Sequence, residues 1–430
     1  MLLINRFRSG ISGDVSLLTM SGALAQVLNL IAYPWLTRVY SPADFGIFAA
    51  VTSIATLFGA LVCLRLDAII QIASEEEETD ILTTALIVSG TITCLTFALV
   101  FVGIAASERL GLGKSVLTAV PPALMATMVA GIALMNGLFA LFRQYAAKQL
   151  RYRRVSVVQL LRTILAVAAQ LVLVFLIPGP VGLIAGFAFG FLVSITLLWP
   201  IHARLIGSIL AAPKIRWNRL QEVLKRHWEF ISVDSVNVLI SASILVLYPL
   251  GVLALFGGSE AGFFALASRI ALIPVTILGA SISTVYFQRF SLAARKRQGA
   301  LRLYLQTLAM AVILALAIVT TLALLIEPLV SFAFDASWAR TSLLVIYLLP
   351  TAFMRFYVSC IANTPLALKK PKVLFVWNLT QLAIIIGAAS LSYREKLEDF
   401  LLYSGLGLLV ASTCYVIFLY NLTRRIEFPQ

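Results

Sequence analysis

Charged residues are scarce in this sequence of 430 residues, where Asp, Glu, Lys and Arg together make up only 12%. Hydrophobic residues make up 61%, and the mean hydropathy is +0.98. So few charges exclude an ordinary soluble domain, in which about a quarter of the residues are charged. The composition predicts a protein whose main solvent is lipid.

Cysteine and histidine are also rare, with four and two residues respectively. Each cysteine stands alone in an apolar run, without the paired spacing of a disulfide or a metal site. Both histidines, His202 and His227, fall in one polar segment outside the apolar runs. The sequence therefore predicts no metal site, no histidine proton relay within the membrane and no cofactor.

Long apolar runs are abundant. A helix of about 20 apolar residues spans the hydrocarbon layer, and period-2 alternation, which a membrane barrel requires, is missing. We therefore expect an all-α integral membrane protein with about 12 transmembrane helices. The predicted spans are 15–36, 45–73, 81–105, 116–141, 155–177, 181–201, 230–256, 262–287, 303–326, 341–364, 373–392 and 399–422.

The basic residues indicate the orientation of these spans. Lys and Arg concentrate in alternate loops, and such loops stay on the cytoplasmic side. With the N-terminus inside, both termini are cytoplasmic, and the net charge of +14 reflects topology and attraction to anionic lipid headgroups. We expect membrane lipids as partners and no nucleic acid. The acidic run 74–80, on the same side, is predicted to be a solvated stretch of charge.

Two stretches of the chain are similar. "SPADFGIFAA" at 41–50 and "SEAGFFALA" at 259–267 each follow a Tyr-Pro pair and each place an acidic residue at a helix start. Six spans per half is an even number, which predicts a parallel repeat of two six-helix bundles around a central cavity. We expect an N-terminal bundle (1–201), an amphipathic cytoplasmic linker at the membrane surface (202–229) and a C-terminal bundle (230–430).

Polar residues at helical spacing are the candidates for lining that cavity. Gln26, Asn29 and Tyr33 share one face of the first span, and Asp234 and Asn237 share one face of the seventh. In the sixth span, small residues recur every fourth position from Gly182 to Ser194. That pattern predicts close helix packing rather than a binding site.

Arginine within apolar runs is the most informative feature. Arg65, Arg162, Arg269 and Arg355 lie in predicted spans, and Asp67 and Asp234 are the acidic residues set against them. A charge at mid-membrane costs at least about 2.5–3.5 kcal/mol, so these side chains need a polar cavity or a partner. Each arginine taken alone has an alternative to substrate binding: its side chain can extend to the membrane interface or pair with an aspartate. Because guanidinium groups suit phosphate oxygens, the surplus of arginine favours an anionic, phosphate-bearing substrate.

Residues 36–70, "LTRVYSPADFGIFAAVTSIATLFGALVCLRLDAII", resemble the first hairpin of Wzx-type polysaccharide flippases, within the multidrug/oligosaccharidyl-lipid/polysaccharide (MOP) exporter superfamily. Residues 264–291 resemble the matching eighth helix of that group. The positions that fit its pattern are Arg38, Pro42, Gly46, Arg65, Asp67, Arg269, Pro274 and Gln288.

This resemblance implies transfer of an undecaprenyl-pyrophosphate-linked oligosaccharide from the inner to the outer leaflet of a bacterial cytoplasmic membrane. The product would feed surface polysaccharide synthesis, as O-antigen of lipopolysaccharide or as exopolysaccharide. A polysaccharide polymerase and a chain-length regulator are the protein partners that such a role implies.

Our mechanistic hypothesis is that the pyrophosphate binds Arg65, Arg269 and Arg355. Arg162 and Arg38 are further candidates for substrate binding. Asp67 or Asp234 would couple transport to protons or sodium.

Other functions remain open. A multidrug exporter of the same superfamily would carry organic cations, but it would favour acidic residues where basic ones dominate here. A membrane enzyme such as an O-antigen polymerase, a ligase or a glycosyltransferase would need a larger outer loop, so we expect no enzyme. A purely structural scaffold would leave the arginines without a role. Trp338, in an outer loop, is predicted either to anchor at the interface or to stack on sugar.

Overall fold

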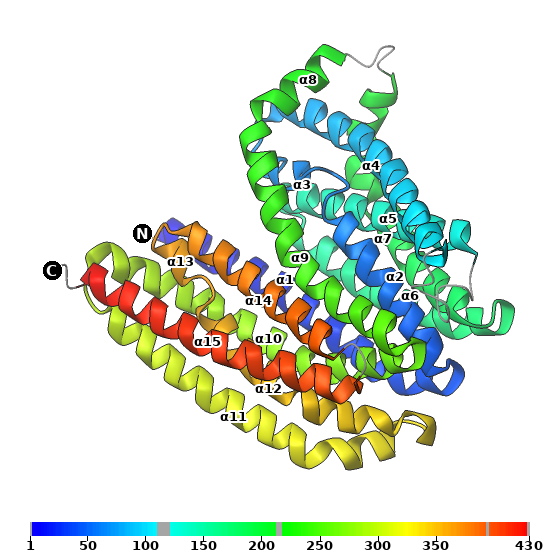
Figure 1. The fold of residues 1–430 in the computed structure, drawn as a ribbon. Coiled ribbons are helices and arrows are strands. Elements are labelled where there is room, and N and C mark those ends of the chain that lie inside the picture. The colour runs from blue at the N-terminus through cyan, green and yellow to red at the C-terminus, as the bar shows by residue number, and fades with distance from the viewer. Residues whose placement is uncertain (1, 110–120, 212–216, 393–394, 428–430) are drawn as a thin grey trace. The chain divides into compact units, whose positions relative to one another are not determined.

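The computed structural model describes residues 2–109, 121–211, 217–392 and 395–427, and the regular elements of these residues are all helical (Figure 1). The elements are α1 (Leu2–Val39), α2 (Pro42–Gly59), α3 (Leu66–Ile69), α4 (Glu75–Arg109), α5 (Pro122–Lys148), α6 (Tyr152–Leu176), α7 (Pro180–Ala211), α8 (Trp217–Arg226), α9 (Trp228–Phe256), α10 (Gly258–Lys296), α11 (Ala300–Ala333), the 3₁₀ turn η2 (Ala336–Trp338), α12 (Arg340–Ile361), α13 (Thr364–Ala367), α14 (Pro371–Leu391) and α15 (Leu397–Glu427).

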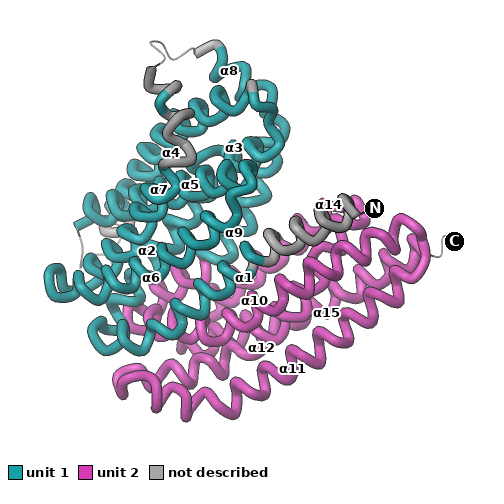
Figure 2. The backbone as a smooth tube through the Cα atoms, turned by 180° about the vertical axis from the view of Figure 1, so that it is seen from behind, with its two compact units in different colours: residues 1–246 teal, residues 247–430 magenta. Residues whose placement is uncertain are grey.

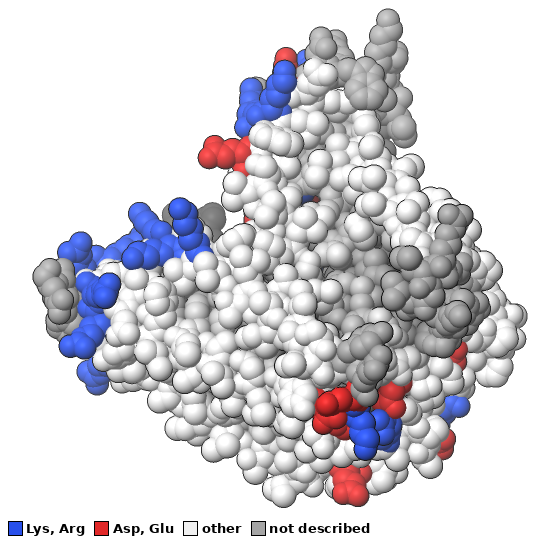
Figure 3. Space-filling model, in the orientation of Figure 1, with Lys and Arg blue, Asp and Glu red and all other residues white. Residues whose placement is uncertain are grey.

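The helices are long and apolar enough to cross a membrane. Eleven candidate spans occur among the described residues, and the predicted span 15–36 lies within α1, whose first side chains are outside the described part. Large apolar side chains such as Phe332 (91% exposed) point outward, as expected where lipid is the solvent. Figure 3 shows wide areas without charged side chains. The predicted all-α membrane fold is confirmed.

The chain forms two compact units, unit 1 (Met1–Val246) and unit 2 (Leu247–Gln430) (Figure 2). The boundary between them along the chain falls within α9. The predicted linker 202–229 is mostly helical, because α7 continues to Ala211 and α8 follows after a short gap. The predicted division at 1–201, 202–229 and 230–430 stays a prediction.

In unit 1, α6 and α7 pack closely along the predicted small-residue stripe. A Cβ atom added at Gly186 would lie 2.6 Å from the backbone nitrogen of Gln170, and one at Gly190 would lie 2.7 Å from the carbonyl oxygen of Arg162. Without a hydrophobic driving force between helices in lipid, such close backbone approach supplies the van der Waals contact that holds them together. The predicted packing role of this stripe is confirmed.

The acidic run 74–80 makes ion pairs within unit 1. Glu78 binds Lys148 of α5 at 2.6 Å, Asp80 binds Arg219 of α8 at 3.3 Å, and Glu77 also binds α8, through Arg226. The helices α4 and α8 are in contact. The prediction of a merely solvated run is therefore wrong, because the carboxylates attach the linker helix to the bundle.

The repeated helix starts use their acidic residues differently. In unit 1, Asp44 accepts hydrogen bonds from the backbone N–H and the hydroxyl of Ser41, at 3.0 and 2.7 Å, in a capping box. In unit 2, Glu260 instead binds Arg340 at 2.8 Å, and Arg340 also binds Glu398 at 3.0 Å. The repeated acidic residue thus caps one helix and joins three helices in the other unit.

Trp338 lies in η2 of unit 2. Its side chain is 0% exposed and meets the Phe263 ring edge-on, with the ring centroids 5.8 Å apart. Both predictions for Trp338, an interfacial anchor and a sugar platform, are wrong, because the ring fills the core beneath the turn.

Replacing Gly186 by alanine should destabilise the protein, because the new Cβ atom would force α6 and α7 apart. We expect a loss of about 1–3 kcal/mol, the usual cost of overpacking, seen as a lower Tm in detergent. Gly207 of α7 is the matched control, because a Cβ atom there meets nothing within 4 Å. An equal Tm for Gly186→Ala and Gly207→Ala would contradict the packing role.

Candidate functional site

The chain between α2 and α3 carries Arg65 on a break in the helix rather than inside the predicted span 45–73. Leu64 and Arg65 adopt positive φ angles of 45° and 60°, a region that side-chain-bearing residues rarely enter. Turn hydrogen bonds, such as Leu64 N–H to the Leu61 carbonyl at 2.7 Å, satisfy the freed backbone. Strained backbone of this kind is kept where it serves a function.

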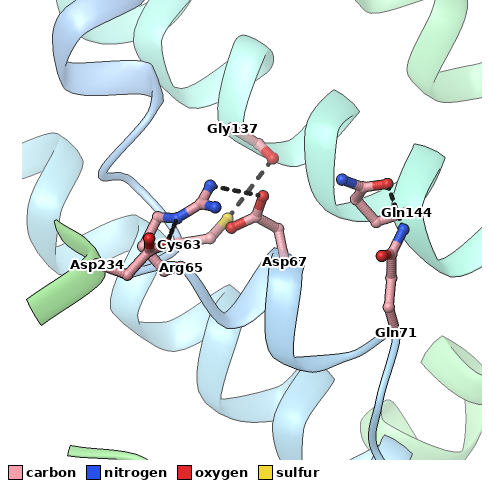
Figure 4. Close-up of polar contacts among 7 residues, drawn as sticks. All are labelled: Cys63, Arg65, Asp67, Gln71, Gly137, Gln144 and Asp234. Atoms are coloured by element: carbon pink, nitrogen blue, oxygen red, sulfur yellow. Dashed lines mark hydrogen bonds and ion pairs between the residues drawn. The ribbon is translucent and has the colours of Figure 1, made fainter. Parts of the chain in front are cut away.

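The break packs directly on α5. A Cβ atom on Gly59 would lie 2.9 Å from the amide nitrogen of Asn136, and one on Gly137 would lie 2.8 Å from the Val62 side chain. The thiol of Cys63 lies 3.6 Å from the carbonyl oxygen of Gly137 (Figure 4). These contacts fix the backbone from which the Arg65 side chain extends.

Arg65 joins two aspartates within unit 1. Its Nε donates to Asp234 Oδ2 of α9 at 2.6 Å, and its Nη1 lies 3.4 Å from Asp67 Oδ2 of α3 (Figure 4). We call these three residues the Arg65 cluster. The structure thus brings together three of the predicted site residues, and it assigns Arg65 the aspartate pairing that the sequence left as an alternative to phosphate binding.

Asp67 is the buried member of the cluster, with 7% of its surface exposed. Burial raises the pKa of its carboxyl, and Arg65, the backbone N–H groups of Asp67 and Ala68, and Arg143 offset this only in part. Burial therefore makes ionisation of this carboxyl less favourable than that of an exposed aspartate.

Two further arginines lie near the cluster in unit 1. The Arg162 guanidinium stacks over the rings of Phe139 and Phe191, at 5.0 and 4.6 Å from the centroids, and that of Arg143 lies 5.9 Å from the Phe139 centroid. Aromatic faces stabilise a cation without neutralising it. With Arg143 included, this region holds three arginines and two aspartates, a net positive charge.

Arg143 was missed from the sequence because the predicted span ended at 141, which left this residue in a loop. In the structure, α5 continues to Lys148. The signal was the seven-residue spacing from Asn136, which places both side chains on one helix face.

Unit 2 holds Arg355 in a different environment. Its Nε is buried without a hydrogen-bond partner among the described residues, as are the hydroxyls of Tyr248 and Thr351. Tyr248 lies close enough to interact electrostatically with Arg355, and it is a neighbour of Thr351 and Ser404. We call Arg355, Tyr248 and Thr351 the Arg355 group. The hydroxyls of Thr351 and Ser404 can accept a hydrogen bond from Tyr248, so Arg355 Nε is the donor of this group that has no acceptor among the described residues.

The other predicted residues are more dispersed. Arg269 is half-buried in α10 and has interaction partners of its own. On α1, Tyr33 is buried against Phe45, with ring centroids 5.9 Å apart, whereas Asn29 is half-buried. The remaining positions are Gln26 and Arg38, both exposed, and Asn237, half-buried on α9.

The fold of the chain is similar to that of several solved membrane transporters. The lipid II flippase MurJ in an inward closed conformation is similar with a TM-score of 0.68 and 16% identity, covering 94% of this chain and 87% of that chain. An inward-facing multidrug resistance transporter of the MATE family is similar with a TM-score of 0.64 and 14% identity, covering 94% of this chain and 95% of that chain. A third similar structure is a MOP superfamily transporter from Pyrococcus furiosus, described as having a binding pocket of reverse polarity. Its TM-score is 0.52 at 13% identity, and the match covers 96% of this chain and 95% of that chain.

The chain belongs to the family of polysaccharide biosynthesis proteins, whose sequence pattern matches residues 35–343. Among curated proteins, none matches it significantly in sequence. The predicted resemblance is confirmed at the level of the polysaccharide biosynthesis family and of a fold similar to solved MOP superfamily transporters, and the protein is a multi-pass membrane protein.

Asp67→Asn should raise the Tm at neutral pH, because it removes a carboxylate whose charge burial disfavours. A raised pKa means that the folded protein holds the proton more tightly than the unfolded chain, so ionised Asp67 destabilises the fold above its folded pKa. The advantage of the variant should shrink as pH falls toward the unfolded value of 3.8. Asp44→Asn, which weakens a helix cap, should lower the Tm instead. A Tm difference between Asp67→Asn and wild type that does not change with pH would contradict this account.

The Arg65–Asp234 pair should appear as an energetic coupling in a double-mutant cycle. We expect Arg65→Gln and Asp234→Asn to be non-additive in unfolding free energy by about 0.5–3 kcal/mol, the range for residues in direct contact. Arg65→Gln combined with Asp44→Asn is the additive control, because Asp44 binds Ser41 instead. Additivity in both cycles would show that the ion pair does not contribute to stability.

Proposed function

We propose that the protein is a flippase that moves undecaprenyl-pyrophosphate-linked oligosaccharides from the inner to the outer leaflet of a bacterial cytoplasmic membrane. Membership of the polysaccharide biosynthesis family supports a role in that pathway. The fold, shared with transporters that include a lipid II flippase, supports movement of cargo across the membrane. The cargo would feed surface polysaccharide such as O-antigen or exopolysaccharide, and no sugar bond would be broken.

The Arg355 group carries the proposal. Buried donors without acceptors are costly, and most native structures avoid them. A phosphate oxygen would accept hydrogen bonds from Arg355 and Tyr248 together, and charge-assisted bonds of this type are strong. An organic cation would leave the Arg355 Nε unsatisfied and would meet a like charge. The group therefore favours an anionic cargo over the alternative of multidrug export.

The Arg65 cluster supplies a means of coupling. In this proposal the pyrophosphate also contacts Arg65 and Arg269, so it must displace Asp234 from Arg65. Protonation of Asp234 or Asp67, or sodium binding there, would release Arg65 for the phosphate. Arg162 and Arg143, held over aromatic rings, would add positive charge without contacting the cargo.

Sugars would contact polar side chains. Those that the proposal assigns are Gln26, Asn29, Arg38 and Asn237. Tyr33 is left out, because it is only 3% exposed and packs against Phe45. Basic residues gather at one end of unit 2, where α10 finishes with Arg295 and Lys296 and α14 begins beside Lys370, and Figure 3 shows blue side chains clustered there. This end would face the cytoplasm, in agreement with cytoplasmic termini. A polysaccharide polymerase and a chain-length regulator would act on the exported units.

A leaflet assay tests the proposal. Purified protein in liposomes, supplied with a labelled undecaprenyl-pyrophosphate oligosaccharide, should make the label accessible to an external reagent. Arg355→Gln should slow this by about 10–100-fold, because hydrogen bonds to charged groups contribute about 1.5–3 kcal/mol.

The matched control is Arg302→Gln, which removes an exposed positive charge from α11 and should leave translocation unchanged. Equal translocation by wild type and Arg355→Gln would overturn the role of the Arg355 group. Gradient-driven transport of a lipophilic cation without lipid translocation would favour the multidrug exporter.

A further inference from the structure

A groove of about 530 Å³ lies between α14 and α15 in unit 2. Its walls are mainly apolar. The lining residues are Lys372, Val373, Val376, Trp377 and Thr380 of α14, and Ala411, Cys414, Tyr415 and Phe418 of α15. The two helices run side by side, as the orange and red ribbons in Figure 1 show.

The spacing of the lining residues shows that the groove follows both helices. On α14, Val373, Val376, Trp377 and Thr380 are separated by 3, 1 and 3 positions, and the residues of α15 repeat this pattern, so each set forms one helix face. From Lys372 to Thr380 the helix rises about 12 Å. That length is close to the thickness of one leaflet, about half of a 30 Å hydrocarbon layer.

Charge is confined to one end of the groove. Lys372 lines that end, and Lys369 and Lys370 precede it in the chain. The neighbouring α15 ends with Arg424 and Arg425 in its last turn. The acidic residue of that turn, Glu427, is already bound to the backbone N–H groups of Gly299 and Leu301, at 2.8 and 2.7 Å. The positive charge at this end is therefore available to an anion.

Tyr415 provides an independent indication of a ligand. Its side chain is 7% exposed and lines the groove, stacked on Trp377 with centroids 4.5 Å apart, yet its hydroxyl has no hydrogen-bond partner among the described residues. Trp377 lies about 7 Å beyond Lys372 along the helix axis. Tyr415, stacked on Trp377, thus lies on the apolar side of Lys372, at the level where a lipid whose headgroup binds Lys372 has its ester carbonyls.

We propose that this groove is a binding site for an anionic phospholipid of the inner leaflet. Lys372 binds the phosphate, the Tyr415 hydroxyl donates to an ester carbonyl, and one acyl chain lies along Val373, Val376 and Phe418. A zwitterionic lipid fills the apolar part equally well, but it gains less from the basic end. The site is separate from the Arg65 cluster and the Arg355 group, and it does not depend on the transported cargo.

Two measurements test the site without a transport assay. Native mass spectrometry of the purified protein should show phosphatidylglycerol retained more than phosphatidylcholine with the same acyl chains. Titrated phosphatidylglycerol should also slow maleimide labelling of Cys414, which lines the groove and is exposed. Cys94, exposed on α4, is the internal reference whose labelling should not change.

Tyr415→Phe should weaken retention of phosphatidylglycerol by about five-fold, the value of one ordinary hydrogen bond. Its Tm should not fall, because the hydroxyl makes no hydrogen bond to any of the described residues. The matched control is Tyr304→Phe, which breaks a 2.9 Å hydrogen bond to the Val416 carbonyl and should lower the Tm while leaving lipid preference unchanged. Lys372→Gln should remove the preference, whereas Arg302→Gln should keep it.

Equal retention of the two phospholipids by wild type would overturn the proposal. An equal loss of the preference for phosphatidylglycerol in Lys372→Gln and Arg302→Gln would also overturn it, because the effect would then come from net charge alone. Protection of Cys414 by undecaprenyl phosphate but not by phosphatidylglycerol would overturn the assignment to a phospholipid and give the groove to the substrate tail.

Discussion

Lipid offers no hydrogen bonds, so each charged or polar group buried in this protein must find its partner within the protein or in a ligand. That constraint explains the helical architecture. It also requires a partner for each buried arginine, and the arginines differ in the partners they have. Arg65 is neutralised by Asp67 and Asp234, and Arg162 rests on two aromatic rings. Arg355 retains a buried nitrogen that has no acceptor in the part of the chain that the structure describes. The three arginines thus satisfy the same constraint to different degrees.

How completely an arginine is paired within the protein bears on whether its role is structural or ligand-binding. A fully paired arginine is stable without cargo, and it becomes available only when its carboxylate is protonated or otherwise occupied. An arginine with a missing acceptor is ready for an anion at any time. In our proposal, the Arg65 cluster therefore makes a regulated contact with the cargo, whereas the Arg355 group recognises its phosphate.

The break between α2 and α3 illustrates how tertiary packing supports such a site. Apolar residues continue through this segment, and from the sequence alone they indicate one continuous span. In the structure, close contact with Asn136 and Gly137 of α5 stabilises a strained turn at Leu64 and Arg65. The turn directs Arg65 toward Asp234, a residue 169 positions away in the chain. Local sequence preference carries no information about that distant contact.

The sequence by itself determined the membrane environment, the family and the candidate site residues. Apolar runs and buried charges have energetic costs that do not depend on the fold. The sequence identified Arg65, Asp67, Asp234 and Arg355 on that ground. Only the tertiary structure decided which of them pair, placed Trp338 in the core, and joined the acidic run to α8. Pairing depends on distances between helices remote in the chain, and those distances are set by packing, such as the close approach of α6 to α7 at Gly186.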